Sequence, residues 1–144
     1  MKLYTIGFTK TSAESFFERL KKAGVRSVVD VRLNNVSQLA GFAKKEDLRC
    51  FTRVIAGASY SHRAELAPTQ DMLDGYKKGG GSWDDYAAKF RSLIVGRRID
   101  ETARREDLDG ACLLCSEDKP HHCHRRLVAE YLREKWGSVE IVHL

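Results

Sequence analysis

The chain has 144 residues, of which 42% are hydrophobic and 31% charged, a balance that indicates one globular domain over residues 1–144 with a single core. No apolar run approaches the ~18 residues of a membrane span, and the first residues lack the layout of a secretion signal, so we expect a cytoplasmic protein without a membrane partner. The net charge of +5 favours anionic partners such as nucleotides or nucleic acid, although the basic pairs are spread along the chain.

The N-terminal part of the chain is typical of a strand, a helix and a second strand. Residues 2–6 alternate weakly as a strand does. The spacing from Thr11 to Glu14 is typical of a capping box, and Gly24 stands where a helix often ends. Residues 25–31 are rich in β-branched side chains, as buried parallel strands are. The right-handed crossover rule then makes the two strands parallel.

The rest of the chain continues this alternation. We predict a helix around 48–55 closed by Gly57, a short strand at 58–60, helices at 69–78 and 82–96, a charged surface helix at 97–108, a strand at 111–115, a helix after Pro120 and a strand at 139–142. The glycine run 79–81 predicts a flexible loop rather than a phosphate cradle, because no Gly-Lys-Ser/Thr follows it. Together these elements predict a single three-layer α/β domain, with a mainly parallel sheet of about five strands and helices on both faces.

Three aromatic side chains of the helix at 82–96 share one face. Trp83, Tyr86 and Phe90 have the spacing of a buried stripe. We therefore expect them in the core rather than on a base-stacking platform.

The stretch 111–126 holds three of the four cysteines and three of the five histidines. It runs from an apolar strand through a polar turn into a helix, which is where open α/β proteins bind ligands. Pro120 is typical of the first helical position and would place Cys123 in the first turn. There, backbone amides, Arg125 and Arg126 would stabilise an anion, either a thiolate or a bound phosphate. Cys123 is therefore a candidate reactive thiol; the plainer alternative is that it packs inward.

A metal site is an alternative use of the same stretch. The candidate ligands for zinc or iron are Cys115, Glu117, Cys123 and His124, and His121 or His122 could replace one of them. Cys112 lies three residues before Cys115 in the strand, so its thiol points to the opposite face. We expect Cys112 and Cys50 to be small core residues, and all four cysteines to be thiols rather than disulfides.

Polar residues also follow the other predicted strands. Asp30 and Arg32 are two apart, so they share one face. Residues 7–9, 30–32 and 115–117 should all lie at the carboxyl ends of parallel strands, where crevices form. His62 and Glu65, after the third strand, could join the same rim.

These motifs resemble one known family, the domain of unknown function 488. The resemblance rests on residues 5–9, on 29–32 with Ser37, on Gly41 and Phe42, on 60–68, and above all on residues 114–117 with 123–125, and it extends from Leu3 to Leu144. It implies a small three-layer α/β fold whose motifs face a common site, without an established activity. The chain departs from the family pattern at Phe8, where histidine or tyrosine is usual, at Thr9, where serine is, and at Asn35, where proline is common.

Our first functional expectation is a phosphate-bearing ligand, a nucleotide or nucleic acid, with catalysis on it. Arg32, Arg125 and the helix N-terminus would hold the anion, Asp30 and Glu117 would be acid and base, and Cys115 or Cys123 a nucleophile. The further residues expected to bind the ligand are Gly7, Thr9, Ser37, His62 and His124. The alternatives are a metal-binding or thiol-redox protein that uses the Cys-x-Glu and Cys-His-Arg motifs, and a non-catalytic interaction domain in which the same polar residues form an ordered network.

Overall fold

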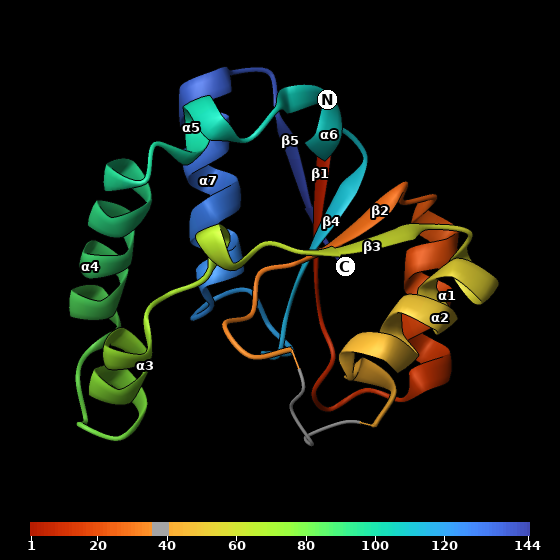
Figure 1. Cartoon of the computed structure of the whole chain (residues 1–144), viewed down its shortest axis with the longest axis horizontal. Coiled ribbons are helices and arrows are strands. Elements are labelled where there is room, and N and C mark those ends of the chain that lie inside the picture. The colour runs from red at the N-terminus through yellow and green to blue at the C-terminus, as the bar shows by residue number, and fades with distance from the viewer. Residues whose placement is uncertain (36–40) are drawn as a thin grey trace.

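The computed structural model describes residues 1–35 and 41–144. Its centre is a five-stranded sheet in the order β3-β2-β4-β1-β5, in which every pairing is parallel (Figure 1). The strands are β1 (Lys2–Gly7), β2 (Ser27–Asp30), β3 (Ser59–His62), β4 (Ala111–Cys115) and β5 (Glu140–His143). The predicted three-layer α/β domain with a parallel sheet is confirmed.

Strand β4 is the centre of the sheet and sets the position of the site. It pairs with β1 on one side and β2 on the other, with Gly7 opposite Cys115 and Asp30 opposite Leu114. Because all three strands run in the same direction, their carboxyl ends meet at one edge. The segments that follow β1, β2 and β4 therefore start side by side.

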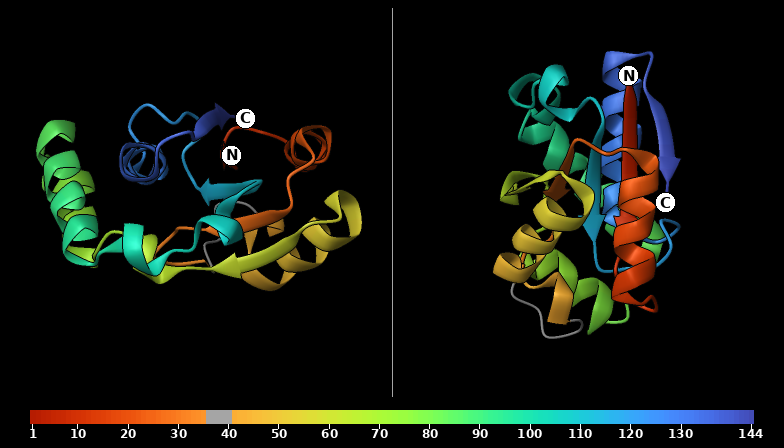
Figure 2. Two further views of the ribbon diagram at one scale, coloured as in Figure 1. Left: turned by 90° about the horizontal axis from the view of Figure 1, so that it is seen from above. Right: turned by 90° about the vertical axis from the view of Figure 1, so that its right-hand side faces the viewer.

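Helices cover both faces of the sheet (Figure 2). The helices are α1 (Ala13–Ala23), α2 (Lys45–Ala56), α3 (Gln70–Lys77), α4 (Trp83–Gly96), α5 (Ile99–Thr102), α6 (Arg105–Leu108) and α7 (His124–Trp136), and the short 3-10 turns are Gly41–Ala43 and Ala64–Leu66. One core lies between the sheet and α1 and α2, and contains Ile6, Val28 and Leu114. The other lies between the sheet and α4 to α7, and contains Leu3, Val29 and Leu113. Side chains alternate between the two cores along each strand.

Most predicted element boundaries agree with the structure. Gly24 and Gly57 end α1 and α2 in the left-handed conformation, as their positions predict. The cap of α1 is one residue later than expected, because the Ser12 hydroxyl, not that of Thr11, accepts the amide of Ser15 at 3.1 Å. Tyr86 and Phe90 are buried as predicted, whereas Trp83, also expected in the core, is only partly buried because it lies at the first residue of α4.

Two predictions about burial were wrong. Residues 97–108 form two short helices rather than one surface helix; the break at Ala103 lets both Ile99 and Leu108 reach the core, where they are fully buried. Cys50 is exposed, whereas Cys112 is buried as expected. On α2 the buried side chains are Leu48 and Thr52, and a residue midway between them points away from the core.

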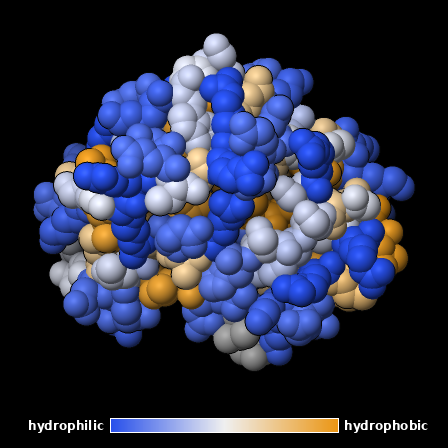
Figure 3. All heavy atoms as spheres, turned by 45° about the horizontal axis from the view of Figure 1, so that its top comes forward, coloured by the Kyte–Doolittle hydropathy of each residue, from blue (hydrophilic) through white to orange (hydrophobic). Residues whose placement is uncertain are grey.

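The described surface is largely polar. On the face shown in Figure 3, hydrophilic side chains predominate and the apolar ones form small separate patches. None of the helices in the described ranges combines the length and the apolar character that a membrane crossing requires.

Gly7, at the end of β1, has a structural reason to be glycine. A Cβ atom built on it would overlap the carbonyl group of Glu117, so the segment after β4 lies directly against the backbone of β1. Glycine permits such a close approach because it has no side chain.

Replacing Gly7 with alanine tests this close approach. The added methyl group forces the segment around Glu117 to move, so we expect a loss in the free energy of unfolding at the upper end of the overpacking range, about 3 kcal/mol. Urea denaturation followed by circular dichroism measures this loss. The matched control is Gly96→Ala in α4, where an added Cβ meets open space and helix propensity favours alanine. Equal stability of the two variants would contradict a tight approach at Gly7.

Candidate functional site

A pocket lies where β2 and β4 end, with a cavity volume of about 250 Å³. One wall comes from residues 32–34, 115–117 and 122–124. The opposite wall comes from α3 and from Tyr86 of α4. The structure therefore brings together the segments after β2 and β4, as predicted, and adds α3 and α4, which the sequence did not connect with the site.

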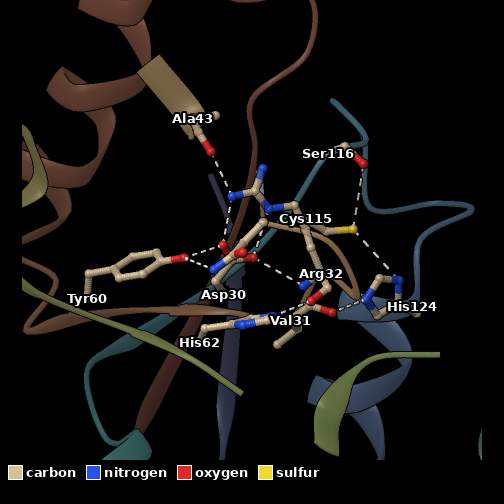
Figure 4. Close-up of polar contacts among 10 residues, drawn as sticks. Asp30, Val31, Arg32, Ala43, Tyr60, His62, Cys115, Ser116 and His124 are labelled. Atoms are coloured by element: carbon tan, nitrogen blue, oxygen red, sulfur yellow. Dashed lines mark hydrogen bonds and ion pairs between the residues drawn. The ribbon is translucent and has the colours of Figure 1, made fainter. Parts of the chain in front are cut away.

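Three buried side chains form a cluster in the pocket wall. The sulfur atoms of Cys115 and Cys123 and a ring nitrogen of His124 all lie within 4.8 Å of one another. The Cys115 Sγ atom is 3.7 Å from His124 Nδ1 and 4.0 Å from the Ser116 hydroxyl (Figure 4). We call Cys115, Cys123 and His124 the thiol cluster.

The orientation of His124 is set from the other side of its ring. Its Nε2 atom lies 2.7 Å from the carbonyl oxygen of Val31 (Figure 4). Because a carbonyl only accepts, Nε2 carries the proton of this hydrogen bond. Nδ1 then faces Cys115, where it accepts from the thiol or, in the imidazolium, donates to the thiolate.

The electrostatics of the cluster favour the second arrangement. A hydrogen bond from Cys123, helped by the charges of His124 and Arg125, lowers the pKa of Cys115 well below its ordinary value, although burial opposes this. Burial lowers the pKa of His124, but the charge of Cys115 and the hydrogen bonds to Cys115 and Val31 together outweigh it, and the net shift is upward. Burial and the neighbouring Cys115 raise the pKa of Cys123. These directions favour a Cys115 thiolate beside a His124 imidazolium over a pair of neutral side chains, with the proton of the two cysteines on Cys123.

The beginning of α7 differs from the prediction. The helix starts at His124 with Cys123 as its N-cap, so Pro120 is not its first residue. Cys123 makes no side-chain cap hydrogen bond. The amide of Arg125 lowers the pKa of Cys123, but burial and the neighbouring Cys115 outweigh this effect. Of the two cysteines, Cys115 rather than Cys123 has the lowered pKa.

Asp30 and Arg32 form a buried ion pair beside the pocket. The Arg32 guanidinium donates to both carboxylate oxygens of Asp30, at 2.9 and 2.7 Å, and to the carbonyl of Ala43 at 2.7 Å (Figure 4). Tyr60 also donates to Asp30, at 2.6 Å. Burial and this hydrogen bond raise the pKa of Tyr60 to about 12. Both oxygens of Asp30 are thus occupied, which suits a positioning group better than an acid or base.

Two other predicted site residues are separate from the thiol cluster. The buried Arg125 guanidinium donates to the backbone carbonyls of Glu117, at 2.5 Å, and Asp118, at 3.5 Å, so it holds the turn after β4 and does not line the pocket. The carboxylate of Glu117 lines the pocket mouth, where it is 46% exposed and lies 3.4 Å from Lys77 Nζ. Glu117 is therefore not grouped with the predicted metal ligands Cys115, Cys123 and His124.

The remaining predicted ligand-binding residues support the site from outside the pocket. Thr9 donates its hydroxyl to the carbonyl of Ser116 at 2.8 Å. His62 Nε2 lies 2.7 Å from the carbonyl of Arg32. Gly7 makes the close approach described above. Ser37, also predicted, lies outside the described residues.

Several residues at the site were not predicted. Phe8 is buried under the Arg32 guanidinium, 4.9 Å from its ring centre, which gives the apolar residue at this position a role. Tyr76 and Lys77 line the pocket from α3, and Tyr86 from α4. No motif marks these three, because they come from helices whose pattern predicts only packing.

The chain matches the family described as Domain of unknown function DUF488 over residues 12–132. The match starts after β1, so the resemblance expected for residues 5–9 is outside it. No curated protein and no solved structure matches the chain. Because the matched range contains the ends of β2 and β4, the thiol cluster and most of the chain, this protein belongs to the DUF488 family.

Proposed function

We propose that the protein is a thiol-dependent oxidoreductase in which Cys115 reacts with a small electrophile bound in the pocket. The observation that supports this most is the 3.7 Å contact between Cys115 Sγ and His124 Nδ1 in the pocket wall. A thiolate is the reactive form of cysteine. A neighbouring imidazolium and a helix N-terminus both stabilise it.

The second thiol makes the reaction a two-electron redox cycle. The Cys115 thiolate attacks the electrophilic atom, for example one oxygen of a peroxide, and becomes a sulfenic acid while the other oxygen leaves with the electron pair. The Cys123 thiol then attacks the Cys115 sulfur, which forms a disulfide and releases water. A dithiol reductant restores both thiols by exchange. Cys123 is close enough for this step because its sulfur lies within 4.8 Å of Cys115.

A phosphate-bearing ligand, our first expectation, stays a prediction, but the two arginines expected to bind the phosphate already have other partners. Arg32 is paired with Asp30, and Arg125 is bound to backbone carbonyls. Lys77 and His122 are the other basic side chains that line the pocket besides His124. A cavity of about 250 Å³ suits a small molecule better than a nucleic acid strand.

A metal centre is the second candidate, and the geometry of the donor atoms favours it. Tetrahedral zinc with one sulfur and one nitrogen ligand separates them by about 3.6 Å, and Cys115 Sγ and His124 Nδ1 are 3.7 Å apart. The hydrogen bond from His124 to Val31 is typical of metal-bound histidines. Cys115, Cys123 and His124 would hold the ion, and a fourth position toward the pocket would let it polarise a bound ligand.

Oxidation by hydrogen peroxide tests the proposed redox cycle. We expect one equivalent to form an intramolecular Cys115–Cys123 disulfide, which intact mass spectrometry detects as a loss of two hydrogen atoms. Cys115→Ser should abolish the reaction. Cys123→Ser should stop it at the sulfenic acid, which dimedone traps. The matched control, Cys50→Ser, changes an exposed cysteine remote from the cluster and should leave disulfide formation unchanged. A disulfide formed by the Cys115→Ser variant, or peroxide-resistant wild type, would refute the cycle.

The lowered pKa of Cys115 predicts how its alkylation depends on pH. We expect iodoacetamide to modify Cys115 at an undiminished rate well below pH ~8.5, the ordinary thiol value. A lowered pKa preserves the reactive thiolate as the pH falls, and the rate declines only below the shifted pKa. Peptide mapping of metal-free Cys50→Ser protein measures this. His124→Ala removes one cause of the shift, so its midpoint should rise. A midpoint at the ordinary value in the parent protein would contradict the ion pair.

Zinc binding tests the second candidate. If the thiol cluster is a metal site, the wild-type protein takes up one equivalent of zinc, measured by elemental analysis after dialysis. The Cys123→Ser and His124→Ala variants should then lack this zinc. Glu117→Gln should keep the metal, because Glu117 pairs with Lys77 at the pocket mouth. Bound zinc should also protect Cys115 from iodoacetamide. Absence of zinc after loading, or loss of zinc only in Glu117→Gln, would exclude this site.

A further inference from the structure

Tyr86 stands apart from the other buried or hydrogen-bonded tyrosines of the chain. The hydroxyls of Tyr60 and Tyr131 donate to carboxylates, at 2.6 Å to Asp30 and 2.8 Å to Asp100. Buried tyrosine hydroxyls usually find such a partner. Tyr86 is only 5% exposed, yet among the described residues its hydroxyl has no hydrogen-bond partner. Among the described residues, the Tyr86 oxygen is not one of the buried polar atoms that lack a partner, so the hydroxyl is the accessible end of a buried ring and is free to donate to a ligand.

The ring of Tyr86 is held firmly in place. It stacks on Tyr76 at 4.9 Å and on Phe90 at 6.4 Å with nearly parallel planes, and Trp83 lies 5.5 Å away. Because the ring faces are covered in this way, Tyr86 offers a ligand its edge and hydroxyl rather than a stacking surface.

The hydroxyl of Tyr86 belongs to the same pocket as the reactive thiol. Tyr86 lines the cavity together with Cys115 and Cys123. Burial, helped by the charge of the neighbouring Cys115, raises the pKa of Tyr86. The hydroxyl therefore remains protonated and is available as a donor.

We infer that the substrate of this pocket is a hydroperoxide and that Tyr86 donates the proton to its leaving oxygen. When the Cys115 thiolate attacks one oxygen, the O–O bond breaks and the other oxygen leaves as hydroxide or alkoxide, a strongly basic group. Transfer of the Tyr86 proton converts it to water or alcohol, and solvent then reprotonates the tyrosinate. This inference rests on the proposed redox function and assigns its substrate class and its proton donor.

The other donors near the cluster are less suited to this step. His124 Nε2 is bound to Val31, and its Nδ1 faces Cys115. Lys77 is paired with Glu117 at the exposed mouth. His122 is exposed and stacked between Trp83 and His121. Tyr86 combines burial, a fixed ring and an uncommitted hydroxyl.

Comparison of two reagents separates proton donation from nucleophile activation. In metal-free Cys50→Ser protein, we compare Tyr86→Phe with its parent for second-order reaction of Cys115 with hydrogen peroxide and with iodoacetamide. Iodide leaves without a proton, whereas hydroxide needs one. We expect a loss of about 100-fold with peroxide, typical of a missing general acid, and a change within about twofold with iodoacetamide. Peracetic acid, whose acetate leaving group is weakly basic, should largely restore the variant's rate. Tyr4→Phe, which removes a tyrosine hydroxyl on the opposite face of the sheet, where it donates to the carbonyl of Ala23 at 3.2 Å, is the matched control and should react like the parent.

The remaining outcomes contradict either the role of Tyr86 alone or the hydroperoxide assignment as a whole. An unchanged peroxide rate in Tyr86→Phe, or equal losses with both reagents, would overturn the role of Tyr86 while the redox function stands. A parent protein whose Cys115 reacts with iodoacetamide but not with any peroxide would overturn the hydroperoxide assignment and the proposed peroxide cycle together. Normal thermal unfolding of Tyr86→Phe confirms that the ring stack is retained.

Discussion

The hydrogen bond from His124 Nε2 to the carbonyl of Val31 is the interaction on which the site depends. It joins the start of α7 to the segment after β2, 93 residues apart in the chain. It also decides which ring nitrogen meets the thiol, because the proton on Nε2 leaves Nδ1 to face Cys115. Without it the ring could turn, and Nδ1 would no longer face Cys115.

The buried Asp30–Arg32 pair fixes the position of the backbone carbonyl that accepts this hydrogen bond. Asp30 accepts from the backbone amide of Arg32 as well as from its guanidinium, so the peptide that carries the Val31 carbonyl is held from both sides. Buried ion pairs often add little net stability, because desolvation offsets their attraction. Their better-supported contribution is to specify one arrangement, and here that arrangement presents Val31 to His124.

Sequence patterns predicted the scaffold well and the site in part. Period-two and period-3.6 patterns give the faces of strands and helices, and parallel strands necessarily bring Asp30 and Cys115 to one edge. The same rules cannot show that Arg125 turns back onto the carbonyls of its own turn, or that Glu117 points to Lys77. Those outcomes depend on the path of residues 116–123, which contain no periodic signal. The segment 97–108 is rich in charged residues, which predicts a surface position. It nevertheless packs against the core, because Ile99 and Leu108 are fully buried.

The four cysteines show why residue type alone could not single out a candidate nucleophile. Cys112 lies three residues before Cys115 in the same strand but faces the core of α1 and α2, where burial raises its pKa and keeps the thiol neutral. Cys50 is exposed on α2, which packs on the face of the sheet opposite Cys115. Within residues 1–35 and 41–144, it is the opposite face of β4 that brings a cysteine together with a histidine and a second thiol. The environment of each cysteine thus depends on the alternation of side chains along one strand, combined with the helix that packs across its end.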